Sequence, residues 1–352
     1  MALVVGVSRG GAVLLSDLAY DLDPSCVARE PSEVRLGRRG LNRMLCVDRK
    51  RKHFEDDYVS SLPAILDPGD VLILNDSRRS AGVLFGYSKE GGQVELRLVR
   101  QISEHCFTAR LFPNHFAKTC AILQVGDFNL RIDDGPGGPH GLYCLTSERP
   151  LADLLRAHGL PITSFFYDGY FELANYNPIY ASEEGSFESP MAGLHLSQEI
   201  LFGLQSREIE IAYLTHHVVG SWLSPTTDQI DDLSLAEESY SVPDATSAAV
   251  RRAKRSGNRV VAVGSTSVRA LESACDDNGV PCSEKGTTKL CIRPGFKFRC
   301  VDAYLTSFHP ARSSLMVLDV AFCELSLLRD AYKHANAERY MFLEFGDAVL
   351  YL

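Results

Sequence analysis

The stretch Val263-Gly264-Ser265-Thr266-Ser267-Val268-Arg269 joins a predicted buried strand to a predicted helix. An apolar, β-branched run begins at Arg259, and leucine and alanine at helical spacing follow Arg269. A strand that turns directly into a helix leaves backbone N–H groups unpaired at the helix start, beside capping hydroxyls and the positive end of the helix dipole. The stretch therefore predicts an α/β protein that holds an anionic or polyhydroxylated ligand at this turn. An ordinary helix N-cap is the alternative.

The composition is typical of a globular protein. The 352 residues are 45% hydrophobic and 23% charged, which allows a sizeable core in one large or two smaller domains. The formal net charge of −9 excludes a general electrostatic attraction to nucleic acid, so an RNA partner needs a local basic patch. The sequence contains neither a membrane-length apolar run nor a basic leader before an apolar stretch. We therefore expect a cytoplasmic protein with no membrane association.

The cysteines and one basic segment bear on two further kinds of site, a metal site and a phosphate site. None of the ten cysteines forms a C-x-x-C pair, so we expect mainly buried, reduced thiols and no metal site. Eight arginines and lysines lie between Arg35 and Lys52. We expect this segment to be solvated surface, with a local patch for phosphates as the alternative.

The chain is predicted to divide into an α/β body, residues 1–69 and 148–352, and an inserted small antiparallel β-barrel, residues 70–147. Short strands separated by turn signals indicate the barrel; they are Val71–Leu74, Val83–Phe85, Gln93–Leu98, Phe107–Leu111, Ala121–Val125, Phe128–Ile132 and Leu142–Leu145. Helices and strands then alternate, as in an α/β fold; they are Leu151–His158, Ser197–Ser206, Glu208–His217, Asp244–Ser256, Arg259–Gly264, the helix after it, Val301–Phe308, Ser313–Ala331 and Tyr340–Leu352.

Polar side chains gather where predicted strands end. Asn75-Asp76-Ser77-Arg78 follows one apolar strand, and two others end at Thr215-His216-His217 and Thr306-Ser307-Phe308-His309. Pro190–His195 places a histidine after a turn of small residues. Groups at the carboxyl ends of strands line the ligand crevice of open α/β sheets. We therefore expect a cluster of three histidines beside a hydroxyl-rich turn, formed by His195, His217, His309 and Ser265–Ser267.

Each of these residues also has a structural interpretation. A single histidine at a strand end is ordinarily a hydrogen-bonding group of the fold, whereas three near one turn favour acid–base catalysis. Asp76 and Arg78 could form a local ion pair, and Glu188, Glu237 and Glu238 could be surface charges. The residues alone indicate an enzyme with an anionic or hydroxylated ligand and do not name the reaction.

These segments, in this order and at this spacing, resemble the motifs of the S-adenosylmethionine:tRNA ribosyltransferase-isomerase family of the queuosine pathway. Asp67–Arg78 resembles the family's NPGDLLVFNDTR, Pro190–His195 its PTAGLH, and Val263–Arg269 its VGTTSVR. Thr306–His309 resembles TNFH. Further matches lie at Gly91–Glu95 (GGKVE), Pro294–Ala303 (PGYxFxxVDA) and Glu338–Ala348 (ERYRFFSYGDAML).

The resemblance implies an α/β body with an inserted β-barrel, and a reaction that consumes S-adenosylmethionine as a co-substrate, with no true cofactor. The ribosyl part moves to the aminomethyl group of a 7-deazaguanine base in tRNA and rearranges to an epoxycyclopentane, while adenine and methionine leave. The sulfonium acidifies the adjacent C5′–H, so a general base is needed there and an acid at the departing adenine.

The resemblance also implies roles for individual residues. The expected catalytic residues are His195, His217, His309, Asp76 and Glu238. The expected S-adenosylmethionine contacts are Asn75, Arg78, Gly193, Ser265, Thr266, Ser267, Arg269 and Thr306. We expect tRNA as the default acceptor, no metal, and a monomer or weak homo-oligomer.

The chain departs from the family pattern in several loops. Arg79–Leu84 lacks the proline and second arginine of VIPARL, and Val219–Leu223 carries Trp222 where the family has GLGTF. Asp232–Glu238 loses both histidines of EHxMHSE and keeps the last glutamate, while Glu188 and Met191 alter AAPTAGLH. A site built for one partner discriminates against analogues that leave its polar groups unpaired. An enzyme of the same fold with a small-molecule acceptor is therefore the alternative, and a binding module without catalysis is the third possibility.

Overall fold

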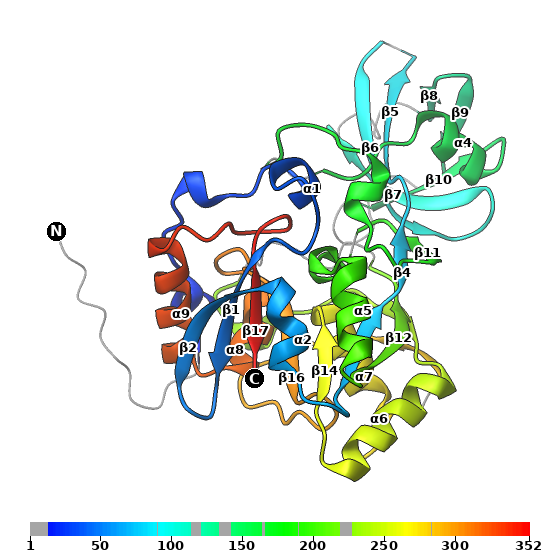
Figure 1. Ribbon diagram of the computed structural model, residues 1–352. Coiled ribbons are helices and arrows are strands. Elements are labelled where there is room, and N and C mark those ends of the chain that lie inside the picture. The colour runs from blue at the N-terminus through cyan, green and yellow to red at the C-terminus, as the bar shows by residue number, and fades with distance from the viewer. Residues whose placement is uncertain are drawn as a thin grey trace.

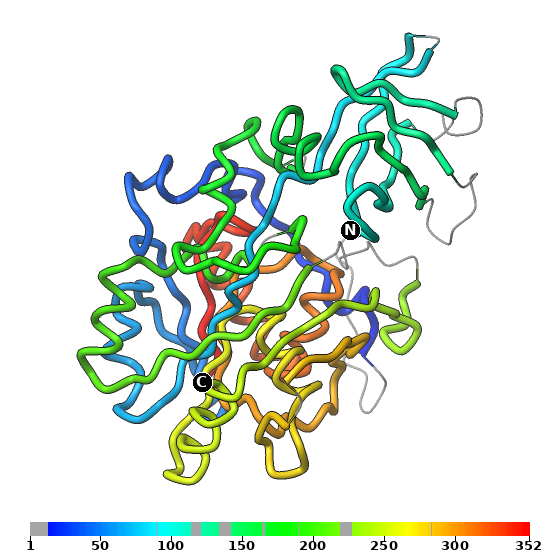
Figure 2. The backbone as a smooth tube through the Cα atoms, turned by 90° about the vertical axis from the view of Figure 1, so that its right-hand side faces the viewer, coloured from blue at the N-terminus to red at the C-terminus, as the bar shows by residue number. Residues whose placement is uncertain are grey.

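The computed structural model describes two main parts, a large sheet covered by helices and a closed barrel beyond one end of it (Figure 1). The barrel projects from the body in the perpendicular view as well (Figure 2). The residues described are 13–89, 91–113, 121–133, 142–163, 166–188, 190–218, 227–282 and 284–352.

The large sheet has nine strands. They are β1 (Arg43–Asp48), β2 (His53–Tyr58), β3 (Val71–Asn75), β12 (Glu210–His216), β13 (Glu238–Ser241), β14 (Val260–Val263), β15 (Lys285–Thr288), β16 (Ala303–Ser307) and β17 (Ala348–Tyr351). Their order is β15-β13-β12-β3-β14-β16-β17-β1-β2. The central strands β12, β3, β14 and β16 are parallel. Their carboxyl ends therefore meet at one edge of the sheet, where ligands bind in open α/β folds.

Helices cover both faces of this sheet, because alternate residues of each central strand point to opposite sides. On β3, Val71 and Ile73 pack in one apolar cluster, and Leu72 and Leu74 pack in the other. The helices α6 (Asp244–Ser256), α7 (Ser265–Ala274), α8 (Ser314–Phe322) and α9 (Leu325–Ala337) contribute to the first cluster. The helices α2 (Leu62–Ile65) and α5 (Gln198–Ser206) contribute to the second.

Shorter helical segments connect these elements. They are η1 (Leu15–Leu18), η2 (Pro24–Cys26), α1 (Ser32–Arg35), η3 (Val59–Ser61), α4 (Leu151–His158), η4 (Leu173–Tyr176), η5 (Met191–His195) and η6 (Ile230–Asp232). A separate parallel pair joins β4 (Ser77–Arg79) to β11 (Glu183–Ser186).

The barrel is closed by six antiparallel strands in the order β10-β7-β6-β5-β8-β9. They are β5 (Val83–Ser88), β6 (Gln93–Gln101), β7 (Cys106–Phe112), β8 (Ile122–Val125), β9 (Phe128–Ile132) and β10 (Leu142–Ser147). On β6 the buried Val94, Leu96 and Leu98 alternate with half-buried residues, among them Arg97. The strict alternation of Gln93–Leu98 therefore fills the barrel with apolar side chains and leaves Arg97 on its outer surface.

The predicted fold class, an α/β body with an antiparallel barrel, is confirmed, and α4 and α6 have the predicted bounds. One assignment was wrong: Val71–Leu74 lies in the centre of the large sheet, so the barrel strands begin at Val83 instead of near Asp70. The physical reason is that β3 is buried along its whole length, as central parallel strands are. The helix expected over Ser313–Ala331 is two helices, α8 and α9, and Tyr340–Leu352 ends in an apolar strand, β17, as expected.

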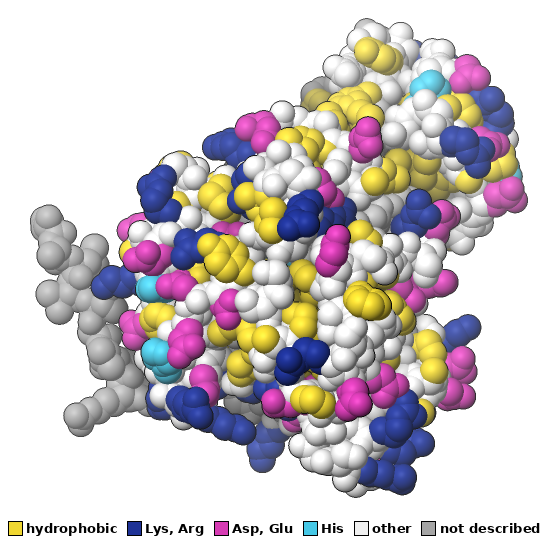
Figure 3. All heavy atoms as spheres, viewed as in Figure 1, with side chains coloured by type: hydrophobic (Ala, Val, Ile, Leu, Met, Phe, Trp, Pro, Cys, Tyr) yellow, Lys and Arg dark blue, Asp and Glu magenta, His cyan; other side chains and the backbone are white. Residues whose placement is uncertain are grey.

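Two arginines of the basic segment near the N-terminus make contacts within the fold. Arg39 donates to two main-chain carbonyls, of Asn177 and Ala174, and Arg49 donates to three others. These guanidinium groups stabilise the fold. On the face of the molecule seen in Figure 3, basic and acidic side chains are intermixed.

The described residues include nine cysteines, all free, while Cys120 lies outside them. No helix in the described part of the chain has the length and apolar character needed to cross a membrane. Within the same residues, histidine, cysteine and carboxylate side chains do not form a group of three or more suited to a metal ion.

Candidate functional site

A cavity of about 480 Å³ lies where the barrel meets the carboxyl edge of the large sheet. The barrel contributes Arg97, Arg110 and Phe112 from β6 and β7. The body contributes the start of α7, the end of β16 and the start of α8. This volume lies within the range of about 300–1,000 Å³ found for small-molecule sites. The cavity is therefore the candidate active site.

The turn from β14 into α7 forms part of the cavity wall. Gly264 is the residue before α7, with φ 86° and ψ 151°, a conformation that is essentially restricted to glycine. Gly264, Ser265 and Thr266 line the cavity, so the N-terminus of α7 faces it. Ser267 does not line it, because its hydroxyl is buried and donates to the Val263 carbonyl at 2.7 Å.

His309 follows β16 and lines the cavity together with Thr306. Its Nε2 lies 3.1 Å from Thr306 Oγ1, and its Nδ1 lies 2.7 Å from Asp319 Oδ2. Both His309 and Thr306 were predicted at the site. Asp319 was not.

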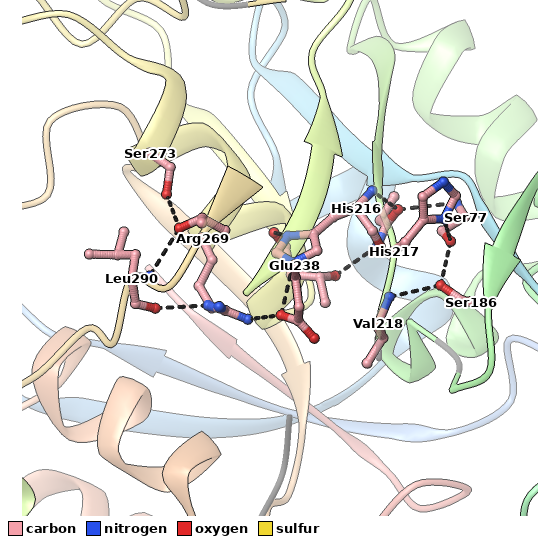
Figure 4. A network of polar contacts seen from close by, with 12 residues as sticks. Ser77, Ser186, His216, His217, Val218, Glu238, Arg269, Ser273 and Leu290 are labelled. Atoms are coloured by element: carbon pink, nitrogen blue, oxygen red, sulfur yellow. Dashed lines mark hydrogen bonds and ion pairs between the residues drawn. The ribbon is translucent and has the colours of Figure 1, made fainter. Parts of the chain in front are cut away.

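Arg269 also lines the cavity and is anchored from behind (Figure 4). Its Nη1 pairs with Glu238, and its Nε donates to the Leu290 carbonyl at 2.9 Å. His216 Nε2 lies 3.0 Å from the same carboxylate oxygen, and Nδ1 donates to the Thr266 carbonyl at 2.9 Å. Burial opposes the charge of Glu238, but the His216 hydrogen bond and the Arg269 charge outweigh it and lower the pKa to about 2. Glu238 therefore holds Arg269 as an ionised carboxylate and does not itself line the cavity.

His217 and Asp76 take part in a second set of contacts, also at the strand ends. His217 Nδ1 lies 2.8 Å from Ser77 Oγ, and Ser77 Oγ lies 2.6 Å from Ser186 Oγ (Figure 4). Burial and the neighbouring His216 lower the pKa of His217. Thr215 donates to Asp76 at 2.7 Å, while burial and Glu183 raise the pKa of this carboxyl. Neither His217 nor Asp76 lines the cavity.

His195 is buried behind the cavity wall. Its Nε2 lies 3.0 Å from the hydroxyl of Ser307, which does line the cavity. Burial lowers the pKa of His195 to about 4, and Arg35 and Arg39 add to the effect, so the imidazole is neutral near pH 7. Gly193, in the same segment, lies so close to Tyr180 and Pro178 that a side chain would clash with them. Packing therefore explains why position 193 is a glycine.

Strand alternation separates Arg78 from Arg79. Arg78 is exposed, whereas Arg79 is 3% exposed, lies over the ring of Tyr176 at 4.5 Å and lines the cavity. Asn75 does not reach the cavity; its Nδ2 donates to the His216 carbonyl at 3.0 Å and to Thr266 Oγ1 at 2.9 Å. Asn75 therefore ties the ends of β3 and β12 to the start of α7.

Several cavity residues were missed in the sequence. Arg97, Arg110 and Glu344 come from segments distant in sequence, and no local pattern marked them. Glu188, a departure from the family pattern and a possible surface charge in the sequence, lines the cavity, and burial raises its pKa to about 7 against the effect of Arg79. Met191, another departure, also lines the cavity. Trp222 and the rest of the segment 219–226 lie outside the described residues.

Comparison with known proteins places the chain in context. A sequence profile described as "Queuosine biosynthesis protein" matches residues 15–351. An S-adenosylmethionine:tRNA ribosyltransferase-isomerase of Thiobacillus denitrificans is 36% identical over 340 residues, which cover 95% of this chain and 96% of that protein. One of the same name from Ralstonia pickettii is 34% identical, with coverage of 96% and 94%.

A solved structure resembles this chain and carries a similar name to these relatives. The crystal structure of an S-adenosylmethionine tRNA ribosyltransferase from Thermotoga maritima covers 96% of this chain, with a TM-score of 0.54 and 28% identity. These relatives are all named for action on tRNA, so the alternative of a small-molecule acceptor is not favoured.

Proposed function

Since this chain belongs to the queuosine biosynthesis protein family, we propose that it is an S-adenosylmethionine:tRNA ribosyltransferase-isomerase. It transfers the ribosyl part of S-adenosylmethionine to the aminomethyl group of a 7-deazaguanine base in tRNA and isomerises it to an epoxycyclopentane. Adenine and methionine are released. As tRNA is the acceptor, the enzyme acts in the cytoplasm.

The observation that carries this proposal is the cavity with a helix N-terminus on one wall and a histidine on another. The start of α7 presents Gly264, Ser265 and Thr266, a site suited to the carboxylate or the ribose hydroxyls of S-adenosylmethionine. Arg269, held by Glu238, adds positive charge to the same wall. These residues bind the donor.

His309 lines the cavity beside Thr306 and presents an imidazole, the side chain that enzymes use most often for general acid–base catalysis. We assign it the removal of the C5′ proton that the sulfonium acidifies, a step for which a positioned imidazole contributes roughly 10²- to 10⁴-fold. His195 and His217 line no part of the cavity, so they support the strand ends without meeting the donor.

The barrel side of the cavity suits the acceptor. Arg97 and Arg110 are opposite each other on β6 and β7, and Phe112 is 46% exposed beside them. Arginines and an exposed aromatic ring are the groups that contact RNA phosphates and unstacked bases. This local basic surface attracts RNA phosphates, which the net charge of −9 as a whole does not.

The test is release of adenine and methionine from S-adenosylmethionine in three parallel reactions. They contain tRNA carrying the aminomethyl-deazaguanine base, the same tRNA with guanine at that position, or a free small amine. We expect release only with the first. Release with the small amine alone would instead support the small-molecule acceptor, and absence of both release and binding would refute the proposed function.

A further inference from the structure

We propose that Asp319 is a positioning residue that fixes the His309 ring so that its Nε2 exchanges protons with the ligand in the cavity. The inference rests on the proposed function for the identity of the ligand. The orientation and tautomer of the ring can be tested without it.

The contacts of His309 define the two ring nitrogens. Nδ1 lies 2.7 Å from Asp319 Oδ2, and an ionised carboxylate only accepts hydrogen bonds, so Nδ1 carries the hydrogen. Nε2 is then the nitrogen that is free to accept a proton. It lies 3.1 Å from the hydroxyl of Thr306, a residue that lines the cavity. A hydroxyl both donates and accepts, so Thr306 can pass a proton between a ligand and Nε2.

The carboxylate is fixed in turn by its surroundings. Tyr332 donates to Asp319 Oδ2 at 3.2 Å and accepts from the His309 N–H at 3.0 Å. Tyr20 donates to the His309 carbonyl at 2.6 Å. Ring and backbone of His309 are therefore held from α8, α9 and the N-terminal segment together, the arrangement by which catalytic groups keep their geometry.

Asp319 is 0% exposed, in an otherwise apolar stretch of α8. The titratable groups facing it are Tyr20, Tyr304, Tyr332, Tyr351 and Cys323, and burial together with the Asp319 charge raises the pKa of each, so all stay neutral. Among the described residues, His309 is its ion-pair partner and no lysine or arginine is. A buried carboxylate with one ionisable partner stabilises the positive charge of that partner.

The alternative is that Asp319 only supports the fold. Its Oδ1 is buried and finds no hydrogen-bond partner in the described residues, so the pair leaves one acceptor unsatisfied. A carboxylate that only supported the fold would carry the free-energy cost of this unsatisfied acceptor. A role acting through His309 accounts for its presence.

The first test compares Asp319→Asn, His309→Gln and the double variant, with thermal melting to confirm that each is folded. For Asp319→Asn we expect a fall in kcat of about 10²-fold or more and little change in KM for S-adenosylmethionine. The kcat falls because the His309 ring loses the carboxylate that orients it. In the His309→Gln background, Asp319→Asn should have no further effect. An equal loss of kcat in both backgrounds would overturn the proposal.

The second test needs no turnover. Nuclear magnetic resonance of ¹⁵N-histidine-labelled protein reports which ring nitrogen of His309 carries hydrogen. We expect Nδ1–H in the wild type and a changed tautomer population in Asp319→Asn, with Asp330→Asn, an exposed aspartate on α9, as the matched control. Nε2–H in the wild type would refute the inference. If S-adenosylmethionine is not consumed with any acceptor, the proposed function fails while this result still decides the role of Asp319.

Discussion

His309 and His195 were both expected at the site, but only His309 lines the cavity. Substitution should therefore separate them. His309→Ala should lower kcat by about 10²- to 10⁴-fold, and it should also lower the melting temperature because the buried Asp319 loses its ion-pair partner. His195→Ala should lower the free energy of unfolding by about 1–3 kcal/mol, because it removes the buried partner of Ser307, and should retain most of the activity. Steady-state kinetics and urea unfolding of both variants check this, and full activity of His309→Ala would contradict the assigned role.

Glu188 should make stability depend on pH. Burial raises its pKa to about 7, against about 4.3 in an unfolded chain. Between these values the folded state binds a proton that the unfolded state has lost, so the free energy of unfolding falls as pH rises. Glu188→Gln should reduce the difference in urea stability between pH 5 and pH 8. Glu184→Gln, at an exposed position on β11, is the control and should keep the wild-type slope. An unchanged slope in Glu188→Gln would show that this carboxyl ionises normally.

At single positions the sequence indicated the right segment more often than the right residue. Arg78 and Arg79 point to opposite sides of a strand, so a shift of one position exchanges solvent for cavity. His217, which was expected at the site, contacts Ser77, whereas its neighbour His216 contacts Glu238 behind Arg269. Asp319 did carry a signal, a single charge within the apolar run Leu315–Phe322, and such a residue must have a partner.

At the scale of elements, the β14–α7 turn depends on the backbone of Gly264. Its φ of 86° and ψ of 151° exclude other residues, so Gly264→Ala should cost about 1–3 kcal/mol and raise KM for S-adenosylmethionine by displacing the start of α7. Gly257 is the matched control: it ends α6 with φ 73°, and an added Cβ meets nothing within 4 Å. Gly257→Ala should lose about 1–2 kcal/mol of stability and leave KM unchanged. Equal KM values in the two variants would argue against ligand binding at the α7 turn.

The pattern of hydrophobicity predicted strands better than it assigned them to sheets. Val71–Leu74 is continuously apolar, which is typical of a central parallel strand, whereas Gln93–Leu98 alternates as a barrel strand does. The regular spacing of the short strands along the chain led us to predict that both belong to the barrel. The break between α8 and α9 was missed because Cys323 and Glu324 interrupt the helix without a proline or glycine.

At the scale of the whole molecule, the candidate site depends on the barrel and the body together. Replacing Arg97 and Arg110 with glutamine should raise KM for tRNA about tenfold or more and weaken its salt dependence, with KM for S-adenosylmethionine nearly unchanged. Arg110 Nε is buried without a hydrogen-bond partner in the described residues, so this guanidinium has a donor left for a ligand. Arg100→Gln, exposed on the same strand β6, serves as control. An equal change for both substrates would assign the pair to the donor side.

This junction could not be predicted from local sequence. Its barrel residues, Arg97 and Arg110, are separated from Gly264 and His309 by long stretches of chain, and only the packing of the two parts brings them to one cavity. The family motifs marked the wall of the cavity that α7 begins, which we assign to S-adenosylmethionine, because a strand–turn–helix has a local signature. The barrel side of the cavity, which we assign to tRNA, consists of alternate residues of two barrel strands. In the sequence, these outward positions cannot be distinguished from ordinary surface positions.

The most direct test of the central claim follows the fate of the ribosyl group. The enzyme is incubated with tRNA bearing the aminomethyl-deazaguanine base and with S-adenosylmethionine labelled either in the ribose or in the methyl group, and the digested tRNA nucleosides are examined by mass spectrometry. We predict that the ribose label enters the modified nucleoside and that the methyl label leaves with methionine. Methyl label in the tRNA, or no label from either substrate, would contradict the account.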